Sequence, residues 1–333
     1  MKNCNNYGAC VRALRVLLSS LLAVLMLLPS VGCADADTRE SIVCSSPVIS
    51  EWTRAVLGSD ADNLNIVTLG ARGADVHSYQ PTVRDIAAVA RCSVFIRNGG
   101  TSETWADGVI TAADNDTMLT LALCEEMEDK LCADVLLPSE HEHEHEHEHE
   151  HGHEGHDHEY DEHIWISFEL ACESVSHICA VLSEARPAMA EKYAENAAAY
   201  VASIRAIEAE YASLRPLCEG RIAVMCDRDP FFYMWEFLGL EVEAAYEGCS
   251  AESEATFSVV SRLSRVIDGR GVRYVLVCES SDGRIADAVI SASRDKNASV
   301  LTLDSMQSEL GQGYIGALKN NLAVLRTALA NGD

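Results

Sequence analysis

The residues with the clearest chemistry are histidines gathered in one short stretch. Nine of the twelve histidines lie between positions 141 and 158, mostly alternating with glutamate or aspartate. In an extended chain, residues i and i+2 point the same way, so imidazoles would line one edge and carboxylates the other. Imidazole is a common ligand for zinc and copper-like ions. We therefore predict that 139–160 is a disordered, solvated loop that captures metal ions. Its histidines are His141, His143, His145, His147, His149, His151, His153, His156 and His158.

Three further residues stand where single metal ligands are found. His163 lies in the stretch DEHIWIS at 161–167, which has the apolar content of an ordered segment. His77 follows the Gly-x-Asp turn Gly73–Asp75, and Asp304 follows the apolar stretch 299–303. An isolated histidine is more often a surface residue, and Asp304 would also serve as a helix N-cap. DEHIWIS lacks the HExxH spacing, so a metallohydrolase that uses Glu162 as its base is disfavoured.

The elements that must position these residues alternate between strands and helices. Short apolar runs that end in glycine or polar residues alternate with helical patterns in both halves of the chain. This order predicts an α/β fold with two lobes, each a parallel sheet flanked by helices. Between the halves, Tyr193 to Leu214 carries one apolar stripe, which predicts a linking helix of roughly 28 residues. We expect lobes at 41–167 and 217–333, with 168–216 joining them as one long rigid helical region.

The amino terminus has the pattern of an export signal. Basic residues precede the apolar run 16–28, which is short for a transmembrane helix, and Gly32-Cys33 resembles the end of a bacterial lipobox. We expect a signal peptide at 1–32, lipidation of Cys33, with ordinary secretion as the alternative, and a tether at 33–40. We therefore expect the chain to act outside the cytoplasmic membrane, lipid-anchored on its outer face or periplasmic.

Charge limits the classes of ligand that the chain can bind, and the cysteine spacing limits the motifs that it can contain. With 25 Lys+Arg against 52 Asp+Glu, the net charge of −27 disfavours nucleic acid and favours cations. The thirteen cysteines include no CxxC pair, so neither a zinc ribbon nor a redox motif is visible. Cys92 and Cys278 sit in apolar runs and are expected to be core residues. Disulfides elsewhere remain open.

Several stretches together resemble a known family. The segments GADVHSYQP at 73–81, NGG at 98–100 with Glu103 and Trp105, DEHIWIS, KYAENA at 192–197 and LDS at 303–305 are similar to the zinc and manganese ABC transporter substrate-binding lipoproteins of cluster A-I, zinc type. The likeness covers nearly all of 41–330. It implies that His77, His163 and Asp304 bind the cargo ion between two lobes, and that the linking helix limits lobe motion.

One position departs from the family pattern. The third ligand, histidine or glutamate in the family, falls at Arg228, whose guanidinium has no lone pair for a metal. Asp227 and Asp229 flank it, and Glu252, Glu254 or Cys249 are further candidates. A site with three protein ligands and water is also possible.

The sequence therefore predicts a receptor and not an enzyme. We expect extracytoplasmic, high-affinity capture of Zn²⁺ as cargo and its delivery to an ABC permease with a separate ATPase. We expect a monomer held at the membrane by its lipid. The resemblance to the family also implies a role in cell adhesion. The alternatives are a manganese-type receptor of the same family and a zinc buffer with no permease partner. Zinc is favoured over Mn²⁺ mainly by the histidine-rich loop.

Overall fold

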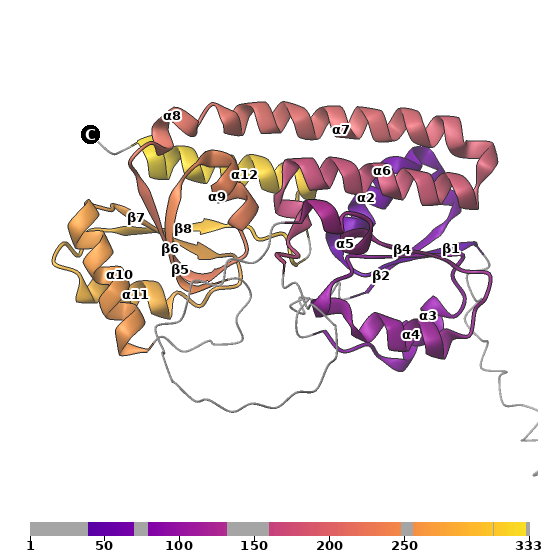
Figure 1. Cartoon of the computed structure of the whole chain (residues 1–333), viewed down its shortest axis with the longest axis horizontal. Coiled ribbons are helices and arrows are strands. Elements are labelled where there is room, and N and C mark those ends of the chain that lie inside the picture. The colour runs from indigo at the N-terminus through magenta and orange to yellow at the C-terminus, as the bar shows by residue number, and fades with distance from the viewer. Residues whose placement is uncertain (1–38, 70–78, 132–159, 248–255, 309, 331–333) are drawn as a thin grey trace, which may run out of the picture. The chain divides into compact units, whose positions relative to one another are not determined.

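The computed structural model describes residues 39–69, 79–131, 160–247, 256–308 and 310–330. From Glu40 onward the chain forms one compact unit. This unit contains two four-stranded parallel sheets, with strand orders β2-β1-β3-β4 and β6-β5-β7-β8 (Figure 1). A long helix, α7, packs on helices of both halves. The predicted fold class, two α/β lobes joined by a long helix, is confirmed.

The first sheet is covered by helices on both faces. Successive residues of β1 point to different clusters, because Ile42 and Cys44 face the main core whereas Val43 packs with residues of α3 and α4. This period of two on both faces is the pattern of a buried parallel sheet. The elements of this half are β1 (Ser41–Cys44), α2 (Pro47–Leu57), β2 (Asn65–Thr68), α3 (Val83–Val89), β3 (Val94–Arg97), α4 (Trp105–Ala113), β4 (Leu119–Ala122) and α5 (Leu123–Glu126).

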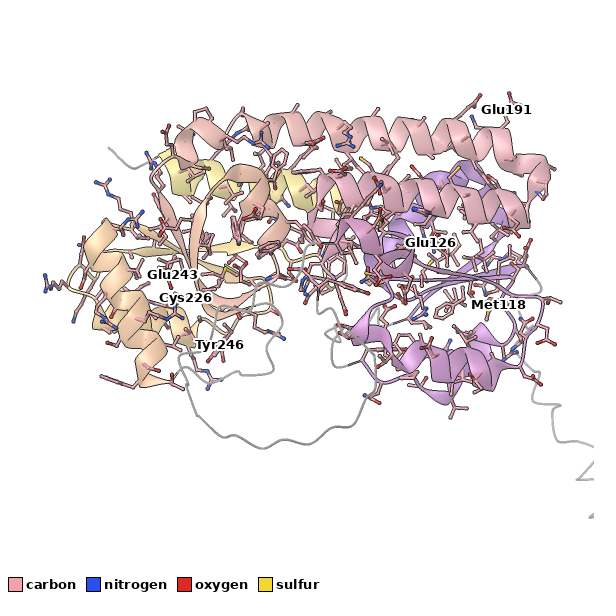
Figure 2. The ribbon with its side chains drawn as sticks, viewed as in Figure 1. Met118, Glu126, Glu191, Cys226, Glu243 and Tyr246 are labelled. Carbon is pink, nitrogen blue, oxygen red and sulfur yellow. The ribbon has the colours of Figure 1, made fainter. Side chains whose placement is uncertain are left out.

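The second sheet repeats this arrangement, and Figure 2 marks it with Cys226 of β5 and with Glu243 and Tyr246 of β6. Met225 faces the main core, while Cys226 packs against α10 and α11. Its elements are β5 (Ile222–Asp229), α9 (Phe232–Leu238), β6 (Glu241–Glu247), α10 (Phe257–Arg270), β7 (Tyr274–Cys278), α11 (Arg284–Ala292), β8 (Ser299–Leu303) and α12 (Gly313–Ala330).

The linking region consists of α6 (Phe168–Ala185), α7 (Ala190–Ala212) and the short α8 (Arg215–Cys218). The predicted stripe is buried on α7, but that helix has 23 residues, and the expected 28 was too long. Pro216 explains the early end, since proline supplies no N–H for the helix ladder and clashes with the preceding turn. At 1.5 Å per residue α7 is about 35 Å long, which suffices to contact α2 in one half and α12 in the other.

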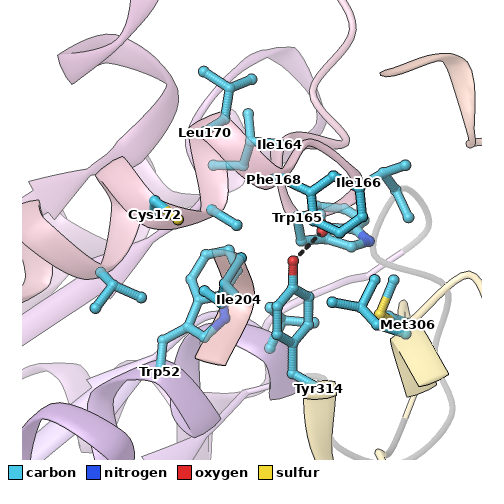
Figure 3. Close-up of a cluster of buried hydrophobic side chains, with 14 of the residues drawn as sticks. Trp52, Ile164, Trp165, Ile166, Phe168, Leu170, Cys172, Ile204, Met306 and Tyr314 are labelled. Atoms are coloured by element: carbon cyan, nitrogen blue, oxygen red, sulfur yellow. Dashed lines mark hydrogen bonds between the residues drawn. The ribbon is translucent and has the colours of Figure 1, made fainter. Parts of the chain in front are cut away.

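The core runs without interruption between the two halves. Figure 3 shows Trp52 of α2 and Tyr314 of α12 in one cluster with the segment 164–168, and their rings lie 5.3 Å apart edge to face. The eight cysteines in the described ranges are free thiols, and Cys92 and Cys278 are buried as expected. None of the helices in those ranges is long and apolar enough to span a membrane.

Candidate metal centre

His163 is a buried imidazole held by its neighbour in sequence. Only 4% of the residue is exposed, and it immediately precedes the 3₁₀ turn Ile164–Ile166. Nδ1 of His163 lies 2.7 Å from Oδ1 of Asp161, which also accepts the backbone N–H of His163 at 2.8 Å. An ionised Asp161 keeps the ring proton on Nδ1, so the lone pair of the neutral ring is on Nε2. A carboxylate behind a histidine in this way orients the ring and raises its basicity toward a metal.

The segment that carries His163 is fastened to the first sheet through Glu162. The side-chain amide of Asn98, just after β3, donates to the backbone oxygen of Glu162 at 3.0 Å. The Glu162 carboxylate accepts hydrogen bonds from the Thr101 hydroxyl at 2.7 Å, from the Ser102 N–H at 3.1 Å and from the Thr101 N–H. Gly100 leaves room for that carboxylate, because a Cβ there would lie 2.5 Å from it and the φ angle is +77°.

The same segment is fastened to the second half of the molecule. The hydroxyl of Tyr233 on α9 donates to the backbone oxygen of Asp161 at 2.8 Å. The indole N–H of Trp165 donates to the backbone oxygen of Ser305 at 2.9 Å. In return, the Tyr314 hydroxyl donates to the backbone oxygen of Trp165 at 2.6 Å, the dashed line in Figure 3. Residues 161–165 are therefore a junction between the two sheets.

Asp229 is the last residue of β5, and the charge of His163 affects the pKa of its carboxylate. Burial raises the pKa of Asp229 to about 6, and hydrogen bonds from Trp235 and from the Phe231 N–H oppose that rise. The charge of Asp161 raises the pKa further, while His163 lowers it. Trp235 Nε1 lies 2.9 Å from Oδ1 of Asp229, which fixes the carboxylate at the carboxyl edge of the sheet. Asp229 is thus the flanking aspartate that shares an environment with His163.

The carboxylate of Asp227 bonds to backbone N–H groups, and Arg228 lies within strand β5. Oδ2 of Asp227 accepts the backbone N–H of Cys278 at 3.3 Å, and Oδ1 accepts the N–H of Arg228 at 2.8 Å. The family pattern puts the third ligand at the start of the helix after the apolar run 221–226, but Arg228 lies on β5 opposite Tyr246 of β6, beyond a register shift between Met225 and Arg228. The strand continues to Asp229, three residues past the end of that apolar run at Cys226. A guanidinium at this position supplies no lone pair to a metal.

Asp304 follows the last strand, at the carboxyl edge of the second sheet. Its Oδ1 accepts the N–H of Met306 at 2.8 Å, and its backbone N–H and carbonyl are both bonded to the Asn321 side chain at 2.8 Å. Burial raises the pKa of Asp304, and the nearby charge of Glu279 raises it further. Glu279 also holds the next residue, because its carboxylate accepts the N–H and the hydroxyl of Ser305, each at 2.8 Å.

The remaining predicted site residues lie outside the ranges that the structure describes. These are His77, Glu252, Glu254, Cys249, Cys33 and the histidines of 141–158. Within those ranges no three His, Cys, Asp or Glu side chains are grouped so as to hold a metal ion. His163, Asp229 and Asp304 therefore form no complete site by themselves, and a full ligand set needs a residue such as His77.

The supporting residues Asp161, Tyr233, Trp165 and Glu279 were given no role from the sequence. A carboxylate two residues before a candidate histidine is a signal for Asp161, and a glutamate directly after the apolar run 274–278 is a signal for Glu279. Tyr233 and Trp165 act through contacts between distant parts of the chain, so no local pattern indicates them.

Known proteins resemble the chain over most of its length. The family model for the zinc-uptake complex component A, periplasmic (ZnuA), matches residues 42–328. The zinc-binding lipoprotein AdcA of Streptococcus pneumoniae is 27% identical over 315 residues, which are 93% of this chain and 60% of that protein. The high-affinity zinc uptake system protein ZnuA of Bacillus subtilis is 26% identical over 310 residues, 90% of this chain and 93% of its own.

Solved structures share the fold at lower sequence identity. The metal-dependent lipoprotein YcdH of Bacillus subtilis aligns with a TM-score of 0.69 at 20% identity, covering 87% of this chain and 99% of that one. The periplasmic zinc-binding protein TroA of Treponema pallidum aligns with a TM-score of 0.68 at 19% identity, with the same coverages. The chain spans about 60% of the AdcA relative that it matches.

Proposed function

The chain belongs to the zinc-uptake complex component A family, and from that premise we propose that it is an extracytoplasmic receptor that binds Zn²⁺ and delivers it to an ABC permease. The single observation that carries the proposal is the buried pair of Asp161 and His163, with 2.7 Å between Oδ1 and Nδ1. This pair presents an oriented imidazole whose lone pair is on Nε2. Zinc favours such a ligand with a carboxylate behind it.

The proposed ligands are His77 and His163 from the first half and Asp304 from the second. Asp229 is proposed as the fourth, in place of the residue at Arg228. Its support is the electrostatic coupling to His163 and Asp161. The Asp227 carboxylate, by contrast, accepts the Cys278 N–H at 3.3 Å and the Arg228 N–H at 2.8 Å. A carboxylate whose pKa is raised by burial gains from a neighbouring cation, since the cation offsets the cost of the buried charge. Glu254 is the alternative outside the described ranges.

The histidine-rich stretch 139–160 is proposed as an auxiliary collector. It would hold ions more weakly than the main site and raise their concentration near it. Its affinity falls as the pH drops through the histidine range, because protons compete for the same lone pairs. Export with lipidation at Cys33, a monomeric state, and an ABC permease with its ATPase as partners complete the proposal.

A hydrolytic role is disfavoured by the surroundings of Glu162. A general base must reach the proton that it removes, with its carboxylate oxygens accessible to the substrate. The residue Glu162 is instead only 7% exposed, and its carboxylate accepts hydrogen bonds from Thr101 and Ser102. It therefore acts as an anchor of the segment that carries His163.

The test is a zinc titration of the mature chain with and without 139–160. A receptor retains one tight site after the deletion and loses it on His163→Ala, while His177→Ala on α6 serves as the matched control. Disappearance of all tight binding with the loop would contradict the proposal. A competing Mn²⁺ titration of the deleted chain separates a zinc receptor from a manganese receptor. Zinc uptake by cells that carry or lack a candidate ABC permease separates a receptor from a buffer.

A further inference from the structure

The turn that follows β8 has an unusual backbone at Met306. This residue has a φ angle of +59°, and in the described ranges Asp114 is the other non-glycine residue with a positive φ. Left-handed backbone is costly for a side chain such as methionine, so it persists only where surrounding contacts impose it. Figure 3 shows the Met306 side chain in the core cluster with Trp165 and Tyr314, and the residue is 1% exposed. Contacts of the turn 304–306 must therefore hold this conformation.

Two successive peptide groups of this turn are held at both ends. In the first, the carbonyl of Asp304 accepts a hydrogen bond from the Asn321 amide at 2.8 Å. The N–H of the same group, that of Ser305, donates to Oε2 of Glu279 at 2.8 Å. In the second, Trp165 donates to the Ser305 carbonyl at 2.9 Å, and the N–H at the other end donates to Oδ1 of Asp304 at 2.8 Å. The Glu279 carboxylate is thus one of the supports that fix the direction of these groups.

Glu279 reaches the turn from the neighbouring strand. It follows β7 directly, and the last residues of β7 and β8 are paired in register, so Glu279 and Asp304 leave the sheet side by side. Oε1 of Glu279 accepts the hydroxyls of Ser305 and Ser308 at 2.8 and 3.4 Å, while Oε2 accepts the Ser305 N–H. Both oxygens are occupied within the fold, which suits Glu279 to support the turn and not to bind the ion.

The turn leaves one oxygen of Asp304 for a cation. Oδ1 accepts the Met306 N–H, and no residue that the structure describes donates a hydrogen bond to Oδ2. The Met306 N–H points at Oδ1 only while both peptide groups keep their orientation. Without Glu279 the first group can rotate, so the second group and the Asp304 carboxylate lose their fixed direction.

We propose that Glu279 is a positioning residue of the zinc site, which holds the turn 304–306 so that Oδ2 of Asp304 binds the ion. This inference rests on the proposed function, because it takes Asp304 as a ligand. Glu279 acts through its hydrogen bonds and not through its charge. A ligand that is held in advance loses less conformational freedom when the metal binds, so this support raises the affinity.

The experiment compares Glu279→Gln and Glu279→Ala in the mature full chain by competition with a chromophoric zinc chelator. In Glu279→Gln the side-chain carbonyl accepts the Ser305 N–H and the amide donates to the Ser305 hydroxyl, so both bonds survive without the charge. Its zinc affinity is expected to stay within threefold of the parent. Glu279→Ala loses both bonds, and its affinity is expected to fall at least tenfold. Equal losses in the two variants would overturn the proposal, because the charge would then be responsible.

Asp268→Ala is the matched control at the opposite edge of the same sheet. Oδ1 of Asp268 accepts the Arg294 N–H at 2.8 Å, in the loop that precedes β8, so this carboxylate supports the start of the strand as Glu279 supports its end. Urea unfolding is expected to show lower stability for both alanine variants. The zinc affinity of Asp268→Ala should change less than twofold, and a loss equal to that of Glu279→Ala would contradict a specific role.

Two further readouts separate positioning from a general effect on the fold. In an Asp304→Ala background, Glu279→Ala should weaken zinc binding less than twofold, since Glu279 acts through Asp304, and a further tenfold loss would contradict the proposal. Without metal, amide hydrogen exchange of 304–306 should be at least tenfold faster in Glu279→Ala and unchanged in Glu279→Gln. Unchanged exchange in Glu279→Ala overturns the positioning whether or not the chain binds zinc. A parent chain without a tight zinc site would instead overturn the proposed function, and with it the role in zinc binding, while the exchange result stands.

Discussion

The hydroxyl of Tyr233 donates a hydrogen bond to the backbone oxygen of Asp161 across 2.8 Å, so a helix of the second half holds the turn that orients His163. The two residues are separated by 72 positions in the chain. This contact ties α9 to the backbone of Asp161, the residue whose carboxylate lies 2.7 Å from Nδ1 of His163. The candidate metal centre therefore depends on the packing of both halves and not on its ligands alone.

Tyr233→Phe is expected to weaken both folding and zinc binding. The buried carbonyl of Asp161 would lose its partner, at a cost of about 1–3 kcal/mol in the free energy of unfolding. Tyr211→Phe is the matched control, because the Tyr211 hydroxyl also donates to a buried carbonyl, that of Leu318, at 2.8 Å, on α7. Urea unfolding should show a loss in both variants, whereas a zinc competition assay should show weaker binding only for Tyr233→Phe. Equal zinc affinities in the two variants would refute the link.

Asp161→Asn is expected to reduce zinc affinity with little change of fold. The amide still fits beside His163, but it no longer supplies the negative charge that keeps the ring proton on Nδ1. Loss of such a partner lowers metal affinity by about 10–100-fold. Competition with a chromophoric chelator measures the affinity, and Asp107→Asn, which alters an exposed aspartate paired with Arg97, is the control. An unchanged affinity would mean that Asp161 has only a structural role.

Asp229→Asn and Asp227→Asn are expected to differ. If Asp229 is the fourth ligand, its amide variant binds zinc at least tenfold more weakly, whereas Asp227→Asn has a smaller effect. In the absence of metal, Asp229→Asn should also be more stable at pH 7, because a carboxylate with a pKa raised to about 6 by burial opposes folding when charged. Zinc competition and metal-free urea unfolding are the two measurements. The reverse order of affinities would assign the ligand to Asp227.

Glu103 predicts a specific pH dependence of stability. Burial raises its pKa to about 7 from the usual 4.5, against hydrogen bonds from Ser45 and the Gly99 N–H. The folded state therefore binds a proton more strongly than the unfolded chain, so the contribution of Glu103 to stability falls as the pH rises from about 4.5 to about 7 and is level above that.

Glu103→Gln should remove this dependence. Compared with the parent protein, the variant is expected to gain about 2–3 kcal/mol in the free energy of unfolding between pH 5 and pH 8. Urea unfolding at several pH values measures the difference, and Glu126→Gln, which alters an exposed glutamate after β4, is the control. A parallel pH profile for the parent and Glu103→Gln would show that the carboxyl is not perturbed.

The fold was predictable from the sequence because local patterns indicate both its strands and its helices. Apolar runs of four or five residues such as 41–44 and 274–278 are strands, and Thr82 caps α3 with a capping box shared with Asp85, three residues on. The helix α7 was predicted too long because the apolar stripe continues past Ala212 to Leu214. The helix ends earlier because Pro216 has no N–H to donate and clashes with the preceding turn.

The candidate site was predictable only in part. His163 and Asp304 stand out by their motifs, but the choice between Asp227 and Asp229 depends on which carboxylate bonds to β7 and which to Trp235. Both contacts are made with residues distant in the chain or beyond the register shift between Met225 and Arg228, which one sequence does not reveal. The part of the site that rests on His77 and on 139–160 remains a prediction.

The junction formed by 161–165 begins almost immediately after the histidine-rich stretch 139–160. Hydrogen bonds from Asn98, Tyr233 and Tyr314 fix the backbone of this junction within a few residues of Tyr160. Because these anchors all lie outside 139–159, we expect that this stretch can be exchanged for a longer, shorter or unrelated sequence while 161–165 keeps them. The same scaffold could carry a reporter or another metal-collecting peptide at this splice point without redesign of the site behind it.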